Sequence, residues 1–94
     1  MAILVDELVE YPHTRLPFRR WCHLVSDHSF DELHAFAARL GIPRHRFQGD
    51  HYDLPAHLRA QAVALGAEEV GWRELIRRMA GPRGDRVRGR REAG

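Results

Sequence analysis

Short apolar runs alternate along this chain with segments of helical periodicity, and this order decides the class of fold. The apolar runs have the length of strands and lie at 2–5, 21–25, around Phe47 and at 67–70. The helical segments lie at 30–40, 55–65 and 72–79. The order β–β–α–β–α–β–α predicts a small α/β domain with a mainly parallel sheet of about four short strands and three helices. Residues 6–20 are expected to form an irregular loop.

The run at 21–25 alternates in polarity, and this alternation predicts which side chains share a face. Trp21, His23 and Val25 fall on one face of a strand, whereas Cys22 and Leu24 fall on the other. Cys22 and His23 therefore point apart, which excludes them as a nucleophile–base pair.

The helices carry their own start and stop signals. Ser29 and Glu32 have the spacing of a capping box, so a helix should begin near Phe30. Gly41 is suited to end that helix, because glycine readily adopts the left-handed conformation of a C′ residue. The last helix has one apolar stripe, expected to be buried, which consists of Trp72, Leu75, Ile76 and Met79.

The charge is divided unevenly between the body of the chain and its C-terminus. All 15 basic residues of the 94-residue chain are arginines, and residues 1–80 carry ten of them against eleven acids. Residues 81–94 hold five arginines against two acids among several glycines, which predicts a disordered tail after a domain spanning 1–80. Because the basic excess lies in the tail, it does not make the folded body a nucleic-acid binder.

The single cysteine, Cys22, excludes an intrachain disulfide and a cysteine-rich zinc site. No apolar run approaches the ~20 residues of a membrane span. The N-terminus also lacks the basic and then apolar pattern of a signal peptide. We therefore expect a cytoplasmic protein that is not anchored in a membrane.

Polar groups gather just before a predicted helix, at a place where α/β folds commonly bind ligands. Asp50, His51, Tyr52 and Asp53 precede the helix at 55–65. A loop in this position leaves backbone N–H groups free at a helix N-terminus, which favours an anion such as phosphate. The sequence therefore predicts a ligand site in this loop.

Acids also follow several apolar segments, and they would meet at one edge of the sheet if the strands were parallel. They are Asp6, Asp27, Asp50 and Asp53. Clustered carboxylates bind Mg²⁺ or Mn²⁺ and can clamp a phosphoryl group. These four acids are the predicted metal ligands, with Mg²⁺ or Mn²⁺ as the candidate cofactor.

Several of these residues have a purely structural interpretation as well. Asp27 and Asp53 are of the type that starts a helix. His23 also fits a half-buried position on a strand. Arg59, one turn into the second helix, suits a bidentate contact to phosphate, and it suits equally an ion pair with Asp53.

Several short motifs occur in order over residues 1 to about 80. They are Ile3-Leu4-Val5-Asp6, Cys22-His23-Leu24-Val25-Ser26-Asp27, Glu32-Leu33-His34, Gly49-Asp50-His51-Tyr52-Asp53, Arg59-Ala60 and Gly66-Ala67. As an ordered set they resemble the bacterial and phage family known as domain of unknown function 4031. The resemblance implies a small stand-alone soluble domain and assigns no catalytic role. The loop before Trp21 departs from the family pattern, which has Tyr-Gly-Arg where this chain has Leu16-Pro17-Phe18-Arg19-Arg20.

Three classes of function fit these features, and the first two involve a phosphate-bearing ligand, either a nucleotide or a nucleic acid. A divalent-metal-dependent phosphoesterase would use as catalytic residues His51, Asp53 and His23. The residues expected to contact the ligand are Arg59, Asp50, Tyr52 and Cys22. The alternatives are a ligand-binding module without turnover and a protein-interaction domain anchored by Trp21, Tyr52 or Trp72.

Overall fold

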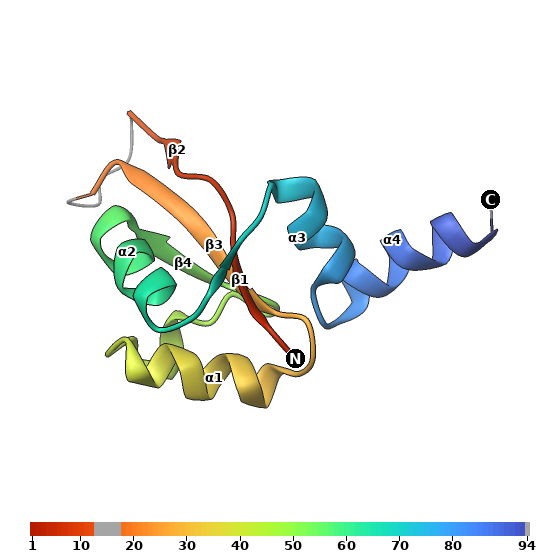
Figure 1. Cartoon of the computed structure of the whole chain (residues 1–94), viewed down its shortest axis with the longest axis horizontal. Coiled ribbons are helices and arrows are strands. Elements are labelled where there is room, and N and C mark those ends of the chain that lie inside the picture. Colours follow the sequence, from red (N-terminus) through yellow and green to blue (C-terminus); the bar gives the residue numbers. More distant parts are fainter. Residues whose placement is uncertain (13–17, 94) are drawn as a thin grey trace.

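The computed structural model describes residues 1–12 and 18–93, the last four of them by their backbone alone (Figure 1). The strands are β1 (Ile3–Val5), β2 (Val9–Glu10), β3 (Arg20–Ser26), β4 (Tyr52–Pro55) and β5 (Glu68–Glu69). The helices are α1 (Phe30–Arg39), α2 (Ala56–Ala64), α3 (Trp72–Arg78) and α4 (Pro82–Ala93), with a 3-10 turn η1 (Arg44–Arg46). Among the described residues, no helix combines the length and the apolar content that crossing a bilayer requires.

The sheet is mixed, and β3 is its central strand. β1 and β2 pair with β3 along one edge and β4 pairs along the other, all three antiparallel. Among the strands that the structure describes, only β1 and β5 pair in parallel. The prediction of a mainly parallel sheet of four strands is therefore wrong. Parallel neighbours need a long crossover, usually a helix, whereas no helix lies between β1 and β3 in the part of that connection that the structure describes.

The segment between β1 and β3 was expected to be an irregular loop, and the structure adds a short strand to it. Val9 and Glu10 form β2, which pairs with Trp21 and Arg20 of β3. Residues 13–17 of the predicted loop, which include Leu16 and Pro17 of the segment that departs from the family pattern, lie outside the described residues.

The strand predicted around Phe47 lies elsewhere. Residues 44–46 form η1, and the strand that this part of the chain adds to the sheet is β4, which begins five residues after Phe47 and pairs with β3. Phe47 lies in the loop after η1, and its apolar side chain packs against the core. Pro55, expected to be the first residue of α2, instead ends β4 opposite Trp21 and serves as the N-cap of the helix. Proline suits this edge strand, since it has no N–H to leave unpaired.

The alternation predicted for β3 is confirmed, because the two faces of the sheet support separate cores. Under α1 and α2 lie the strand residues Ile3, Val5, Cys22, Leu24, Tyr52 and Leu54, packed on Leu33, Phe36, Ala37, Leu40 and Ala62. The opposite face buries a smaller cluster under α3, which consists of Leu4, Val25, Leu75 and Met79. Figure 1 shows α1 and α3 lying apart, on different sides of the strands.

The predicted start of α1 is confirmed, whereas the predicted stripe of α3 is buried only in part. Ser29 accepts a hydrogen bond from the Glu32 N–H at 3.1 Å, as in a capping box. Gly41 follows the helix with a φ of +76°, the left-handed conformation expected of it. Of this stripe, Leu75 and Met79 are buried as predicted and Ile76 is partly buried, but Trp72 at the first turn is 55% exposed. A helix of only two turns covers the sheet with its later residues and leaves its first residue beside the sheet edge.

The C-terminal segment differs from the expected disordered tail, because it forms the fourth helix, α4. The start of α4 is packed: a Cβ added to Gly84 would lie 2.0 Å from the carbonyl oxygen of Met79. Arg88 donates hydrogen bonds to the carbonyl oxygens of Arg77 and Met79, both at 2.9 Å. These contacts satisfy the open C-terminus of α3, a role that is invisible in a composition of arginine and glycine. Beyond them α4 projects from the body (Figure 1).

Candidate functional site

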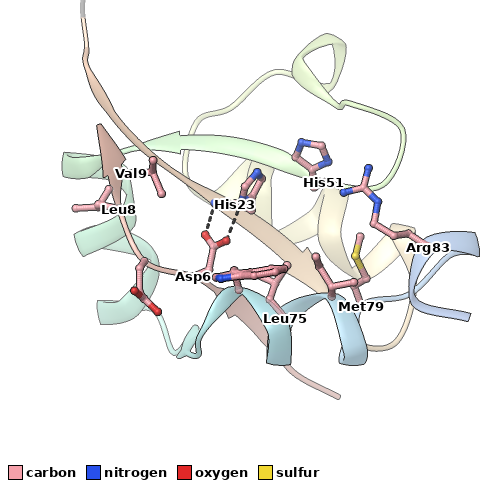
Figure 2. A pocket seen from close by; sticks show the side chains of 11 residues that line it. Asp6, Leu8, Val9, His23, His51, Leu75, Met79 and Arg83 are labelled. Atoms are coloured by element: carbon pink, nitrogen blue, oxygen red, sulfur yellow. Dashed lines mark hydrogen bonds and ion pairs between the residues drawn. The ribbon is translucent and has the colours of Figure 1, made fainter. Parts of the chain in front are cut away.

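The site begins with a buried carboxylate that holds a histidine of the central strand. Asp6 directly follows β1 and is 3% exposed. Its carboxylate accepts hydrogen bonds from the backbone N–H of His23 at 2.7 Å and from His23 Nδ1 at 2.8 Å. Because a carboxylate only accepts, Nδ1 carries the proton, and the lone pair of His23 is on Nε2. This pair is drawn with dashed lines in Figure 2.

A second carboxylate–histidine pair lies beside the first. Asp50 and His51 sit in a tight turn, in which the Gln48 N–H donates to the His51 carbonyl at 2.8 Å and Gly49 has a φ of +93°. His51 Nδ1 lies 2.6 Å from an Asp50 carboxylate oxygen, so Asp50 orients this ring as Asp6 orients that of His23. The centres of the two imidazole rings are 5.1 Å apart, and the rings meet edge to face with an interplanar angle of 71°.

Asp53 completes a triad with these two histidines. It stands opposite His23 in the β3–β4 pairing, and its carboxylate lies 3.3 Å from His51 Nε2. One ligand atom from each of His23, His51 and Asp53 lies within 4.8 Å of the other two. Two imidazoles and one carboxylate, each imidazole backed by a second carboxylate, form a donor set that could hold a divalent metal ion.

The contact between His51 and Asp53 shifts the pKa of both groups. The contact with Asp53 raises the pKa of His51, although burial acts in the opposite direction. The same contact lowers the pKa of Asp53. Both shifts favour a proton shared between His51 Nε2 and Asp53, at the place where a metal ion would be coordinated, so a metal ion would compete with this proton.

Two residues of the triad, His23 and His51, line a pocket of about 240 Å³ between the sheet and α3. Figure 2 shows the side chains of Asp6, His23 and His51 on one side of it and those of Leu75 and Met79 on the other. The apolar part of the wall comes from Leu8, Val9, Trp72, Leu75, Ile76 and Met79. Asp53 lines a second pocket of about 300 Å³, together with Trp21, Ile42 and Leu58, so the triad lies between two pockets.

Arg83 is a pocket residue that the sequence did not reveal. It comes from the first turn of α4, and its Nε lies 3.4 Å from an Asp50 carboxylate oxygen. In Figure 2 its guanidinium points toward His51. Sequence reasoning placed this arginine in a disordered tail. The available signal was Pro82, which is well suited to the first turn of a helix.

The predicted site residues divide into those that converge and those that do not. Asp6, His23, Asp50, His51 and Asp53 come together. Asp27 does not, because β3 runs antiparallel to β1 and its carboxyl end lies beside the start of β1. There Asp27 accepts a hydrogen bond from the Ala2 N–H at 2.7 Å and lies 3.2 Å from Arg78. Burial acts to raise the pKa of Asp27, but these two contacts outweigh it and lower that pKa.

Tyr52, Cys22 and Arg59 are likewise outside the pocket that His23 and His51 line. Tyr52 and Cys22 lie on the opposite face of the sheet, where the Tyr52 hydroxyl is 2.8 Å from His34 Nδ1. Burial raises the pKa of the Cys22 thiol to about 12. Arg59 donates from Nε to the Asp6 carbonyl at 2.7 Å and pairs with Glu69 at 2.9 Å, so it ties α2 to the end of β1.

The observed donor set also changes which metals suit the site. Two of the four acids predicted as ligands, Asp6 and Asp50, instead hold imidazoles, and Asp27 is remote. Imidazole nitrogens favour transition ions such as Zn²⁺ or Fe²⁺, whereas Mg²⁺ prefers sites made of oxygen. Of the two candidates named from the sequence, Mn²⁺ fits this triad better than Mg²⁺.

The sequence matches the family described as protein of unknown function (DUF4031) over residues 3–81, and the chain belongs to this family. The match covers every residue of the triad and both supporting acids, and it ends before Arg83. No curated protein and no solved structure matched the chain.

Proposed function

We propose that this member of the DUF4031 family is a divalent-metal-dependent phosphoesterase. The observation that supports the proposal is the convergence of His23, His51 and Asp53 to within 4.8 Å of one another, beside a pocket lined by Arg83. Catalytic metal sites commonly have three protein ligands and an open position, as this triad offers. The single buried Cys22 agrees with activity in the reducing cytoplasm.

The chain's own residues would hold the ion and the anion in place. Asp6 and Asp50 fix the two imidazoles through Nδ1, so that both Nε2 atoms would face the ion once the proton between His51 and Asp53 is released. A divalent ion bound there would polarise a phosphoryl oxygen and lower the pKa of a bound water. Arg83 supplies a positive charge at the pocket wall. Its guanidinium would leave the Asp50 carboxylate and pair with a phosphate oxygen instead. The imidazoles thus take the ligand role that the sequence assigned to carboxylates.

Calorimetric titration of the chelator-treated protein with Zn²⁺, Mn²⁺ and Mg²⁺ tests the metal site. We expect binding of a transition ion that is lost in His51→Ala and in Asp53→Asn, with both variants folded by circular dichroism. His45→Ala and Asp31→Asn, which change exposed residues, are the matched controls and should bind as the parent does. Equal binding by all four variants would show that the triad is not the site.

Turnover is tested separately with bis(p-nitrophenyl) phosphate and p-nitrophenyl phosphate in the presence of the ion that binds. We expect metal-dependent release of p-nitrophenol that disappears in Asp53→Asn. The alternative is a ligand-binding module without turnover, for which the triad and Arg83 would hold the ligand. Tight metal binding with no hydrolysis of either ester would favour that alternative.

A further inference from the structure

We infer that the pocket takes one nucleotide of a single-stranded nucleic acid, whose neighbouring phosphates lie along α4. This inference rests on the proposed function and names its substrate class. It joins three features that the phosphoesterase proposal leaves unused: the exposed indole in the pocket, the small size of the pocket, and the arginines of α4.

The first feature is an aromatic surface next to the anion site. Trp72 is 55% exposed, lines the pocket and has the Arg73 guanidinium 5.2 Å from its ring centre. Proteins bind unpaired bases by stacking them on aromatic rings, with arginine contributing cation–π and phosphate contacts. A base held in a duplex cannot stack in this way, which favours a single strand.

The second feature is the size of the pocket. Its volume of about 240 Å³ is below the ~300–1,000 Å³ of sites that enclose a whole small ligand. The pocket is therefore suited to one unit of a longer ligand, and the rest of that ligand must lie on the surface outside.

The third feature is the direction of α4. Its first turn places Arg83 in the pocket, and the helix then leaves the body (Figure 1). The packing of Gly84 on Met79 and the hydrogen bonds from Arg88 fix the angle at which it leaves. Five arginines against two acids in residues 81–94 make this arm basic, while residues 1–80 are close to neutral. A strand that extends from the pocket along α4 would find its phosphates paired with arginine.

The test measures binding of a fluorescently labelled single-stranded DNA oligonucleotide by anisotropy across a salt series. The charge variant of the full chain combines Arg86→Ser, Arg90→Ser and Arg91→Ser. The matched control removes three exposed arginines that lie outside α4 and line neither pocket, with Arg20→Ser, Arg39→Ser and Arg44→Ser. Because the charge variant can no longer pair three arginines with phosphates, its slope of log affinity against log salt should fall by about 2, and the control's slope should not.

Trp72→Ala tests the stacking surface in the same assay. Loss of one stacked base should weaken oligonucleotide binding by between about fivefold and a hundredfold while the salt slope is unchanged. An unchanged affinity in Trp72→Ala, or equal salt slopes for the charge variant and its control, would overturn the inference. So would a parent protein that binds the oligonucleotide no more tightly than a mononucleotide.

Metal titration of the same variants separates this inference from the proposed function. The charge variant should keep the metal affinity of the parent, since the triad lies outside α4. A parent that binds a metal ion but not the oligonucleotide contradicts the nucleic-acid inference alone. A parent that binds the oligonucleotide through α4 but binds no metal ion contradicts the phosphoesterase proposal alone.

Discussion

The two faces of the central sheet use the same strands for opposite purposes. On the face under α1 and α2, Cys22, Leu24 and Leu54 are all at most 2% exposed. On the other face, His23 and Asp53 project beside a pocket, with side chains 40% and 46% exposed. Successive residues of one strand therefore alternate between a closed core on one face and an open site on the other.

The covering helices account for this difference. α1 and α2 together span the first face, whereas the short α3 covers only the part around Leu4 and Val25. The uncovered end of that second face keeps its polar side chains accessible. Substitutions on the closed face should therefore change stability, and those on the open face should change binding.

The largest effect should come from the closed face. Leu54→Ala, at a position with 0% exposure, should lower the free energy of unfolding by about 2–5 kcal/mol in urea denaturation. Trp72→Ala, on the open face, should lower it by roughly 1 kcal/mol or less. Equal losses in the two variants would mean that the open face is as much a core as the closed one.

A next smaller effect is expected where α4 meets α3. In Gly84→Ala the new methyl group would meet the Met79 backbone at 2.0 Å, which should cost about 1–3 kcal/mol of stability. Gly89→Ala in the same helix is the control, because its Cβ would have no neighbour within 4 Å. There the helix propensity of alanine should stabilise by up to about 1 kcal/mol if α4 is formed in solution. Thermal denaturation of both variants measures the contrast, and matching melting temperatures would show that α4 is not docked.

On the open face, the acids that orient the imidazoles should affect metal affinity. Asp50→Asn should weaken metal binding by about 10–100-fold, because the ring of His51 would then be held by a neutral amide instead of a carboxylate. Asp31→Asn, an exposed acid on α1, should leave the affinity unchanged. Calorimetric titration compares the two, and an unaffected Asp50→Asn would show that His51 needs no such support.

The smallest effect should be the pH dependence of the His51–Asp53 contact. The raised pKa of His51 means that its contribution to stability is full below about 6.5 and is lost as the pH rises through the folded value. The lowered pKa of Asp53 means that its contribution is present above about 3.8 and is lost as the pH falls through the folded value. The stability difference between the metal-free parent and His51→Gln should therefore be largest between these two pH values. His45→Gln should show no such maximum in urea titrations at several pH values, and a flat difference for His51→Gln would contradict the contact.

Short sequence patterns correctly predicted several features that depend on residues close together in the chain. Alternation along 21–25 assigned the faces of β3 correctly, and the spacing of Ser29 and Glu32 placed the start of α1. The grouping of Asp50, His51 and Asp53 identified part of the triad, because these residues are close in the chain as well as in space.

Strand direction could not be predicted in the same way. An apolar run of three residues is the same in a parallel and in an antiparallel pair, so Asp27 was assigned to the wrong edge of the sheet. Arg83 was missed because its role depends on α4 docking against Met79, a contact between segments whose sequences show no periodicity in common.

The reactivity of Cys22, which is buried on the closed face, reports how often the core around it opens. With a thiol pKa near 12 and 2% exposure, Cys22 is neither a thiolate nor accessible in the folded state. A disulfide reagent can therefore reach it only in molecules whose β3–β4 core has opened, so the labelling rate measures how often that core opens. Because Asp53 and His23 belong to the same two strands, a metal ion that binds them should slow this labelling, even though it never contacts the sulfur.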